Sequence, residues 1–253
     1  MAEIHISNEQ LRAEMEPFKQ WSGPKIAKVF GRTNIPDFEY NPIGSGGFIF
    51  YRNRYFFVTN HHVVESIEGD VLENTVVSFL DEGKEIAKFV GVKSDKEIDI
   101  CVLEIDPEFA QRHSDRQFLS SDCFENTTEY LGRCNFVFIH GFPYANTEID
   151  SNAKVIETTS LPYMTFIEGY YEDLELIRLS CNKEDNVDEF GQAIRLPEFY
   201  GMSGSFVFSY RLRDIANPYG LLGVVTMGTL ESETIWLVPA ENIISFIDNN
   251  FFE

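Results

Sequence analysis

The sequence predicts an all-β fold with one helix at each end, and three observations point to it. From about residue 43 onward the chain is a series of short apolar segments separated by turn residues. Its aromatic residues are mostly phenylalanine (23) and tyrosine (11), which favour strands. Apolar residues at helical spacing occur near the two ends. We therefore expect two consecutive antiparallel barrels or sandwiches, framed by helices.

Residues 1–42 are expected to form an N-terminal helical extension. Ser7 and Gln10 make a capping box, and apolar side chains follow at helical spacing. Residues 26–30 are predicted to be a second short helical piece, and residues 36–42 a connector. The apolar stripe of the first helix is expected to pack on a barrel. Docking of a partner or activator is the alternative.

Two β units are expected after this extension. The first, residues 43–125, begins with a hairpin that turns at Arg52-Asn53. Its further strands are expected in residues 74–80, 85–93 and 98–105. Residues 107–130 are polar and link the two halves. The second unit, residues 126–253, ends in a helix over Ala240–Asp248. Its strands are expected in residues 133–143, 173–181, 204–210, 219–227 and 234–239.

Charge and cysteine content limit the partners and the compartment. With 41 acidic and 20 basic residues the formal net charge is −21, which repels nucleic-acid phosphates and anionic lipid head groups. We therefore expect neither nucleic acid nor a membrane as a partner; attraction of basic peptides fits the charge, as does solubility alone. The first residues show no secretory signal, so we expect a cytoplasmic protein with reduced thiols. The cysteines are Cys101, Cys123, Cys134 and Cys181.

Two short motifs contain residue types used in nucleophilic catalysis. His61 and His62 interrupt the apolar run FVTNHHVV, where the alternative is a pair of polar residues that end a strand. Ser203 lies between glycines in GMSGS. A nucleophilic serine needs a tight, exposed turn and backbone N–H groups that are free to stabilise an oxyanion. The alternative for this motif is a turn that enters a strand.

The third candidate is Asp99 in the segment EIDICVLEID, where both alternating faces are apolar. An acid inside such a strand is costly to bury unless it accepts hydrogen bonds, and a histidine N–H is one suitable donor. The alternative is an aspartate at the mouth of the strand, solvated or bound to backbone amides. Asp95 and Asp106 have more polar surroundings, so we favour Asp99.

Together, these motifs resemble the chymotrypsin/trypsin-like serine peptidase superfamily, and most closely its bacterial branch near the Deg-type (HtrA) proteases. TNHHV is similar to the family's T-x-x-H-V, DICVL to D-I-A-V-L, and GMSGS to G-x-S-G-G. GLLGVVTMG resembles the strand that pairs with the substrate backbone, and VPAENIISFI resembles the closing segment and C-terminal helix. The resemblance covers about residues 43–250.

The resemblance implies two six-stranded antiparallel β-barrels with the active site in the cleft between them. It implies that His62 is the general base, that Asp99 orients it, and that Ser203 is the nucleophile. The first barrel would supply His62 and Asp99, and the second Ser203. The backbone N–H groups of Gly201 and Ser203 would form the oxyanion hole.

The activity implied is that of a serine endopeptidase acting on protein or peptide substrates, with a regulatory protein partner as a further candidate. Thr226, Met227 and Gly228 would bind the substrate. No metal or organic cofactor is implied. The alternative is a catalytically silent module that binds peptides on the same fold.

Some residues depart from the family pattern or carry two interpretations. Met202 stands where digestive members have an aspartate that pairs with a new N-terminus, so that activation route is excluded. Another trigger orders the site, or none is needed. Glu198 could favour a basic residue before the scissile bond, although a solvated loop glutamate is favoured. His140 is expected to cap a strand end, and the acidic segment 181–192 to be either a solvated loop or an exosite for a basic partner.

Overall fold

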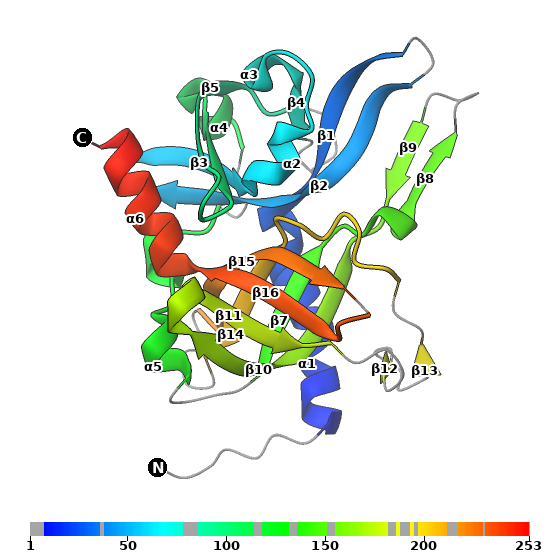
Figure 1. Cartoon of the computed structure of the whole chain (residues 1–253), viewed down its shortest axis with the longest axis vertical. Coiled ribbons are helices and arrows are strands. Elements are labelled where there is room, and N and C mark those ends of the chain that lie inside the picture. Colours follow the sequence, from blue (N-terminus) through cyan, green and yellow to red (C-terminus); the bar gives the residue numbers. More distant parts are fainter. Residues whose placement is uncertain are drawn as a thin grey trace.

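The structure is a computed structural model, and it is mostly β (Figure 1). It describes residues 8–35, 38–77, 86–113, 118–131, 136–150, 155–181, 186–187, 193–194, 197–211, 217–229 and 231–252. Among these residues, no helix is both long enough and apolar enough to cross a bilayer. The acidic segment 181–192 lies largely outside the described residues, as does the capping-box residue Ser7.

The first β unit is a six-stranded antiparallel sheet in the order β4-β1-β2-β3-β6-β5. Its strands are β1 (Ile26–Ile35), β2 (Phe38–Tyr51), β3 (Arg54–Thr59), β4 (Thr75–Val77), β5 (Phe89–Asp95) and β6 (Ile100–Ile105). A barrel was expected here, but the described sheet is open between β4 and β5. A backbone hydrogen bond from Ala87, two residues before β5, to Val77 of β4 joins the two sides (2.8 Å).

The start of this sheet differs from the predicted helical extension. Residues 26–30 are part of strand β1 and not a short helix, and Phe38–Pro42 of the expected connector belong to β2. Residues 26–30 are four apolar residues and Lys28, a segment too short to show a clear period, and pairing with β2 makes it part of a strand. The predicted hairpin turn is confirmed, because Tyr51 pairs with Arg54 and the two residues between them have positive φ (46° and 63°).

The second β unit is a closed antiparallel barrel in the order β10-β11-β16-β15-β14-β7. Its strands are β7 (Phe136–Gly141), β10 (Leu161–Tyr171), β11 (Leu176–Ser180), β14 (Phe206–Tyr210), β15 (Tyr219–Thr229) and β16 (Thr234–Pro239). Strand β10 was not predicted from the sequence. Two small strand pairs complete the unit: β8 (Thr147–Asp150) with β9 (Val155–Thr158), and β12 (Asn186–Val187) with β13 (Ala193–Ile194).

Helices frame the two units. They are α1 (Asn8–Ser22), α2 (His61–Glu65), α3 (Val71–Asn74), α4 (Pro107–Gln111), α5 (Thr127–Leu131) and α6 (Ala240–Phe251), with 3₁₀ turns η1 (Gly23–Lys25), η3 (Ser121–Cys123), η4 (Tyr144–Asn146) and η5 (Glu172–Leu174). The predicted C-terminal helix is confirmed and runs to Phe251. In Figure 1, α6 leaves the barrel and returns to the first sheet, where Phe251 packs on Phe56 (5.1 Å between ring centroids).

Buried apolar residues form three clusters, one inside each β unit and a third between them. The third cluster joins Ile49 and Phe56 of the first sheet to Phe206 and Phe208 of the barrel. At its centre the Phe206 ring covers the backbone of Gly47, where a side chain would overlap it. The two β units therefore share a core, which fixes each unit against the other.

Helix α1 packs on the barrel through Phe18, which is fully buried and stacks on Phe138 (4.7 Å). His140 lies next to the last residue of β7, near the strand end where it was expected, and it is fully buried under this helix. Its Nδ1 is 2.7 Å from the hydroxyl of Ser22, at the end of α1, and its Nε2 is 2.9 Å from the hydroxyl of Ser160. His140 thus links the helix to the barrel.

Candidate active site

His62 lies at the junction between the first sheet and a short helix. Strand β3 ends at Thr59, and α2 begins two residues later, so the imidazole lies beyond the end of the strand and is 46% exposed. Its Nδ1 is 2.8 Å from Oδ2 and 3.0 Å from Oδ1 of Asp99, and its backbone N–H donates to Oδ1 (3.0 Å). Because an ionised carboxylate only accepts hydrogen bonds, Nδ1 carries a proton and donates it to Asp99.

Asp99 lies immediately before strand β6 and not within it, which corrects the sequence interpretation. Its φ is 53°, a left-handed conformation that aspartate tolerates better than most residues. The backbone carbonyl of Asp99 accepts a hydrogen bond from the Asn60 side chain (2.9 Å). This bond and the left-handed turn orient the carboxylate toward His62. The apolar residues around Asp99 in the sequence did not reveal this turn.

The carboxylate of Asp99 also accepts a hydrogen bond from the hydroxyl of Thr226, on β15 of the barrel. Burial by itself would raise the pKa of Asp99, but the hydrogen bonds from His62 and Thr226 outweigh it and hold this pKa below its usual value. Asp99 is therefore ionised at neutral pH. Sequence reasoning assigned Thr226 to substrate binding, whereas its side chain contacts Asp99.

Ser203 lies on a tight turn before β14, between two glycines of positive φ, Gly201 (90°) and Gly204 (85°). A side chain at Gly204 would overlap the carbonyl oxygen of Ser45, so the turn approaches β2 more closely than any other residue allows. The N–H of Gly204 donates to the carbonyl of Val225 (2.9 Å), which anchors the turn to the neighbouring strand.

The same glycine-lined contact brings Ser203 and the histidine helix close to each other. A Cβ added at Gly44 would lie 2.7 Å from Val63, the residue after His62, and 3.2 Å from the carbonyl oxygen of Ser203. Both segments thus flank Gly44. Across the described residues, the Ser203 hydroxyl and the His62 ring do not form a hydrogen bond.

The turn that carries Ser203 has two backbone N–H groups without a bonded acceptor among the described residues. Within the described part of the chain, neither the Gly201 N–H nor the Ser203 N–H donates a hydrogen bond. The carbonyl of Tyr200, on the peptide that carries the Gly201 N–H, accepts instead from the N–H of Tyr144 (2.6 Å). Because the C=O and N–H of one peptide point in opposite directions, this bond turns the Gly201 N–H away from Tyr144.

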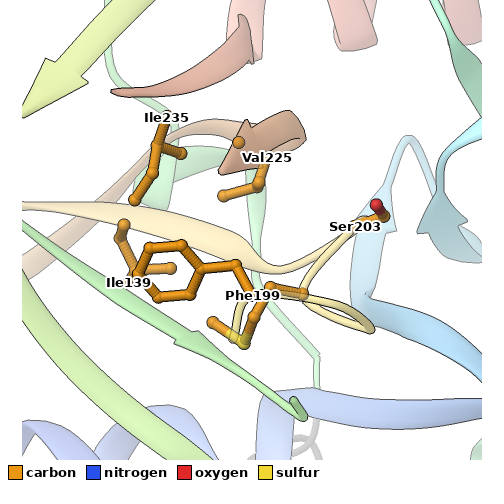
Figure 2. Close-up of a pocket in the computed structure, with 7 residues that line it drawn as sticks. Ile139, Phe199, Ser203, Val225 and Ile235 are labelled. Carbon is orange, nitrogen blue, oxygen red and sulfur yellow. The ribbon is translucent and has the colours of Figure 1, made fainter. Parts of the chain in front are cut away.

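A small apolar pocket opens beside Ser203, as Figure 2 shows. Its lining residues are Ile139, Phe199, Met202, Ser203, Val225, Gly228 and Ile235. Of the three predicted substrate-binding residues, Gly228 lines the pocket, Met227 is 55% exposed, and Thr226 is buried against Asp99. Glu198 is exposed and does not line the pocket.

No protein-family model and no curated protein matches this chain. In the described residues, histidine, cysteine, aspartate and glutamate do not gather in groups of three or more that could hold a metal ion. In the structure, His62 contacts Asp99, and Ser203 lies on a neighbouring turn beside an apolar pocket. Two backbone N–H groups of that turn donate no hydrogen bond within the described residues.

Proposed function

We propose that this chain is a serine endopeptidase that cleaves peptide bonds with Ser203, His62 and Asp99. The observation that carries the proposal is the geometry of Asp99, whose carboxylate accepts hydrogen bonds from the His62 backbone, the His62 ring and the Thr226 hydroxyl. A carboxylate held at a histidine ring in this way fixes its tautomer, which is the role of the acid in a Ser-His-Asp triad. A serine on a glycine-flanked turn next to the same histidine helix supports the assignment.

The reaction would proceed in two steps. In the first, Ser203 Oγ attacks the carbonyl carbon of the peptide, and its proton passes to His62 Nε2. The carbonyl oxygen then carries the negative charge and is stabilised by the N–H groups of Gly201 and Ser203. His62 gives its proton to the leaving amine, which forms an acyl-enzyme. In the second step, water takes the place of the serine hydroxyl and releases the acid.

Asp99 would act through electrostatics rather than through proton transfer. Its low pKa keeps it ionised, so it stabilises the imidazolium that forms when His62 takes the serine proton. Removal of one oxyanion-hole donor in such enzymes costs about 10²- to 10³-fold in kcat, so the open N–H groups of Gly201 and Ser203 carry a large share of the rate.

The pocket favours substrates with an apolar residue before the scissile bond. The side chains of Ile139, Phe199, Met202, Val225 and Ile235 line it, and it has no charged lining residue. A lysine or arginine placed there would bury an unpaired charge, which costs several kcal/mol. We therefore expect small or medium apolar side chains, and not the basic residues that Glu198 would favour.

Labelling with a fluorophosphonate probe tests the proposal, because the probe phosphonylates an activated serine. We expect the wild type to be labelled and both Ser203→Ala and His62→Ala to lose the label. Ser205→Ala is the matched control, since Ser205 lies two residues away and is fully buried. Absence of label on a folded wild type would refute the enzyme and favour the peptide-binding module, which a peptide pull-down would then detect.

A peptide-library digest tests the substrate class. We expect cleavage after apolar residues, with discrimination of about 10- to 200-fold between side chains that differ by one or two methylene groups. Cleavage chiefly after lysine or arginine would contradict the pocket argument and leave the triad assignment intact.

A further inference from the structure

Two polar residues of the first sheet lie buried behind the turn that carries Ser203. Lys28 on β1 and Ser45 on β2 are directly paired across the two strands, and they are 3% and 0% exposed. Side chains at paired positions project from the same face of an antiparallel sheet. Here both reach across the shared core to backbone groups of the barrel.

Ser45 holds two barrel loops with one hydroxyl. Its Oγ donates to the carbonyl of Gly201 and accepts from the N–H of Phe142, both at 2.9 Å. The backbone N–H of Ser45 also donates to the carbonyl of Ser203 (2.8 Å). The hydroxyl therefore uses both its donor and an acceptor site, and the residue fixes the carbonyl groups on either side of Met202.

Lys28 completes this contact from the neighbouring strand. Its Nζ donates to the carbonyl of Phe142 (2.6 Å), so both peptide groups that flank Phe142 are bonded to the first sheet. The ammonium also lies close to the turn, because a Cβ added at Gly201 would be 3.1 Å from Nζ. The ammonium group of Lys28 therefore leaves Gly201 little room to move toward the first sheet.

The environment of Lys28 is unusual for a lysine. Among the described residues, no carboxylate lies within ion-pair distance of its Nζ, and burial lowers its pKa to about 8. A buried cation without a carboxylate partner destabilises a fold, so such a residue near a reactive serine is a candidate for a functional role.

We propose that Lys28 and Ser45 are positioning residues that hold the turn from Tyr200 to Ser203 in the conformation that presents its two N–H groups to an oxyanion. This inference rests on the proposed peptidase function and adds that the hole is formed by contacts within the chain. The inference favours a site that needs no trigger, which is one of the two interpretations given above for Met202.

The fluorophosphonate probe also tests this inference, because its phosphonyl oxygen occupies the oxyanion hole. The variants are Lys28→Met, which keeps the length of the side chain, and Ser45→Ala, which removes only the hydroxyl. We expect the second-order rate constant of labelling to fall by roughly 10- to 100-fold in each variant. We also expect the ³¹P chemical shift of the Ser203 adduct to move toward that of the adduct in denatured protein, as a looser hole predicts.

Lys25→Met is the matched control. Lys25 is also a buried lysine in the N-terminal part of the chain, but its Nζ donates to the carbonyl of Trp21 (2.6 Å). We expect this variant to keep both the labelling rate and the ³¹P shift. Thermal denaturation of all variants separates loss of fold from loss of positioning, and Ser45→Ala provides the reading if Lys28→Met does not fold.

The outcomes separate the two proposals. A wild type that does not react would refute the peptidase function, and this inference with it. A reactive wild type whose Lys28→Met and Ser45→Ala variants keep the wild-type rate and ³¹P shift would refute the positioning role alone.

Discussion

Acidification should destabilise this protein through His140. The neutral imidazole is fully hydrogen-bonded: the Ser22 hydroxyl donates to Phe18 and so accepts from Nδ1–H, and the Ser160 hydroxyl donates to Nε2. A second ring proton would remove the acceptor that Ser160 bonds and place a charge in the core. Burial accordingly lowers the pKa of His140 to about 3.

The sign and size of the effect follow from the difference between the folded and unfolded pKa. In the unfolded chain the imidazole has a pKa of about 6.5, so between pH 6.5 and 3 the unfolded state binds a proton that the folded state does not. The stability that His140 contributes is therefore complete above pH 6.5 and is lost as the pH falls toward 3. Between pH 8 and pH 5 the loss is about 2 kcal/mol, and by pH 3 it is roughly 4 kcal/mol.

Urea denaturation of the wild type and His140→Gln at pH 8 and pH 5 measures this term. Other titrating groups contribute equally to both proteins, so the difference between the two pH dependences isolates His140. We expect the wild type to lose about 2 kcal/mol more than the variant between these pH values. Equal losses in the two proteins would refute the argument, as would an NMR titration in which His140 takes a proton near pH 6.5.

Substitutions at Gly204, Thr226 and Phe18 probe the fold and the site. Gly204→Ala should cost roughly 3 kcal/mol or more in urea denaturation, since its Cβ would overlap β2, while Gly69→Ala, also at positive φ but on the surface, should cost about 1 kcal/mol; equal costs would contradict this. Thr226→Val should raise the pKa of Asp99 and slow fluorophosphonate labelling about tenfold, whereas Thr226→Ser should not; equal rates would exclude the hydroxyl. Phe18→Ala should cost about 3–5 kcal/mol by thermal denaturation if α1 is part of the core, and less than 1 kcal/mol would show that it is not.

Much of the β architecture could be predicted from local patterns. Alternating apolar residues around Arg52-Asn53 specify a hairpin because the turn type needs residues that accept positive φ. The C-terminal helix follows from its apolar spacing over Ala240–Asp248. Residues 26–30 were misassigned because a short, mostly apolar segment fits a strand and a helix equally well, and only pairing with β2 distinguishes them.

The candidate site, too, could be predicted only in part from the sequence. His62, Asp99 and Ser203 were selected by short motifs, and their catalytic roles stay predictions. The sequence could not show that Thr226 would bond Asp99 or that Lys28 and Ser45 would reach Phe142 and Gly201, since each contact joins segments more than 90 residues apart.

The sequence by itself therefore determined the first hairpin, several further strands and the C-terminal helix, because hairpin turns, strand alternation and helix spacing are properties of neighbouring residues. The tertiary structure alone decided that the first sheet is open in the described residues, that His140 is a buried link to α1, and that the pocket is apolar. Burial and hydrogen-bond partners come from distant segments, so they exist only once the two β units have packed on their shared core.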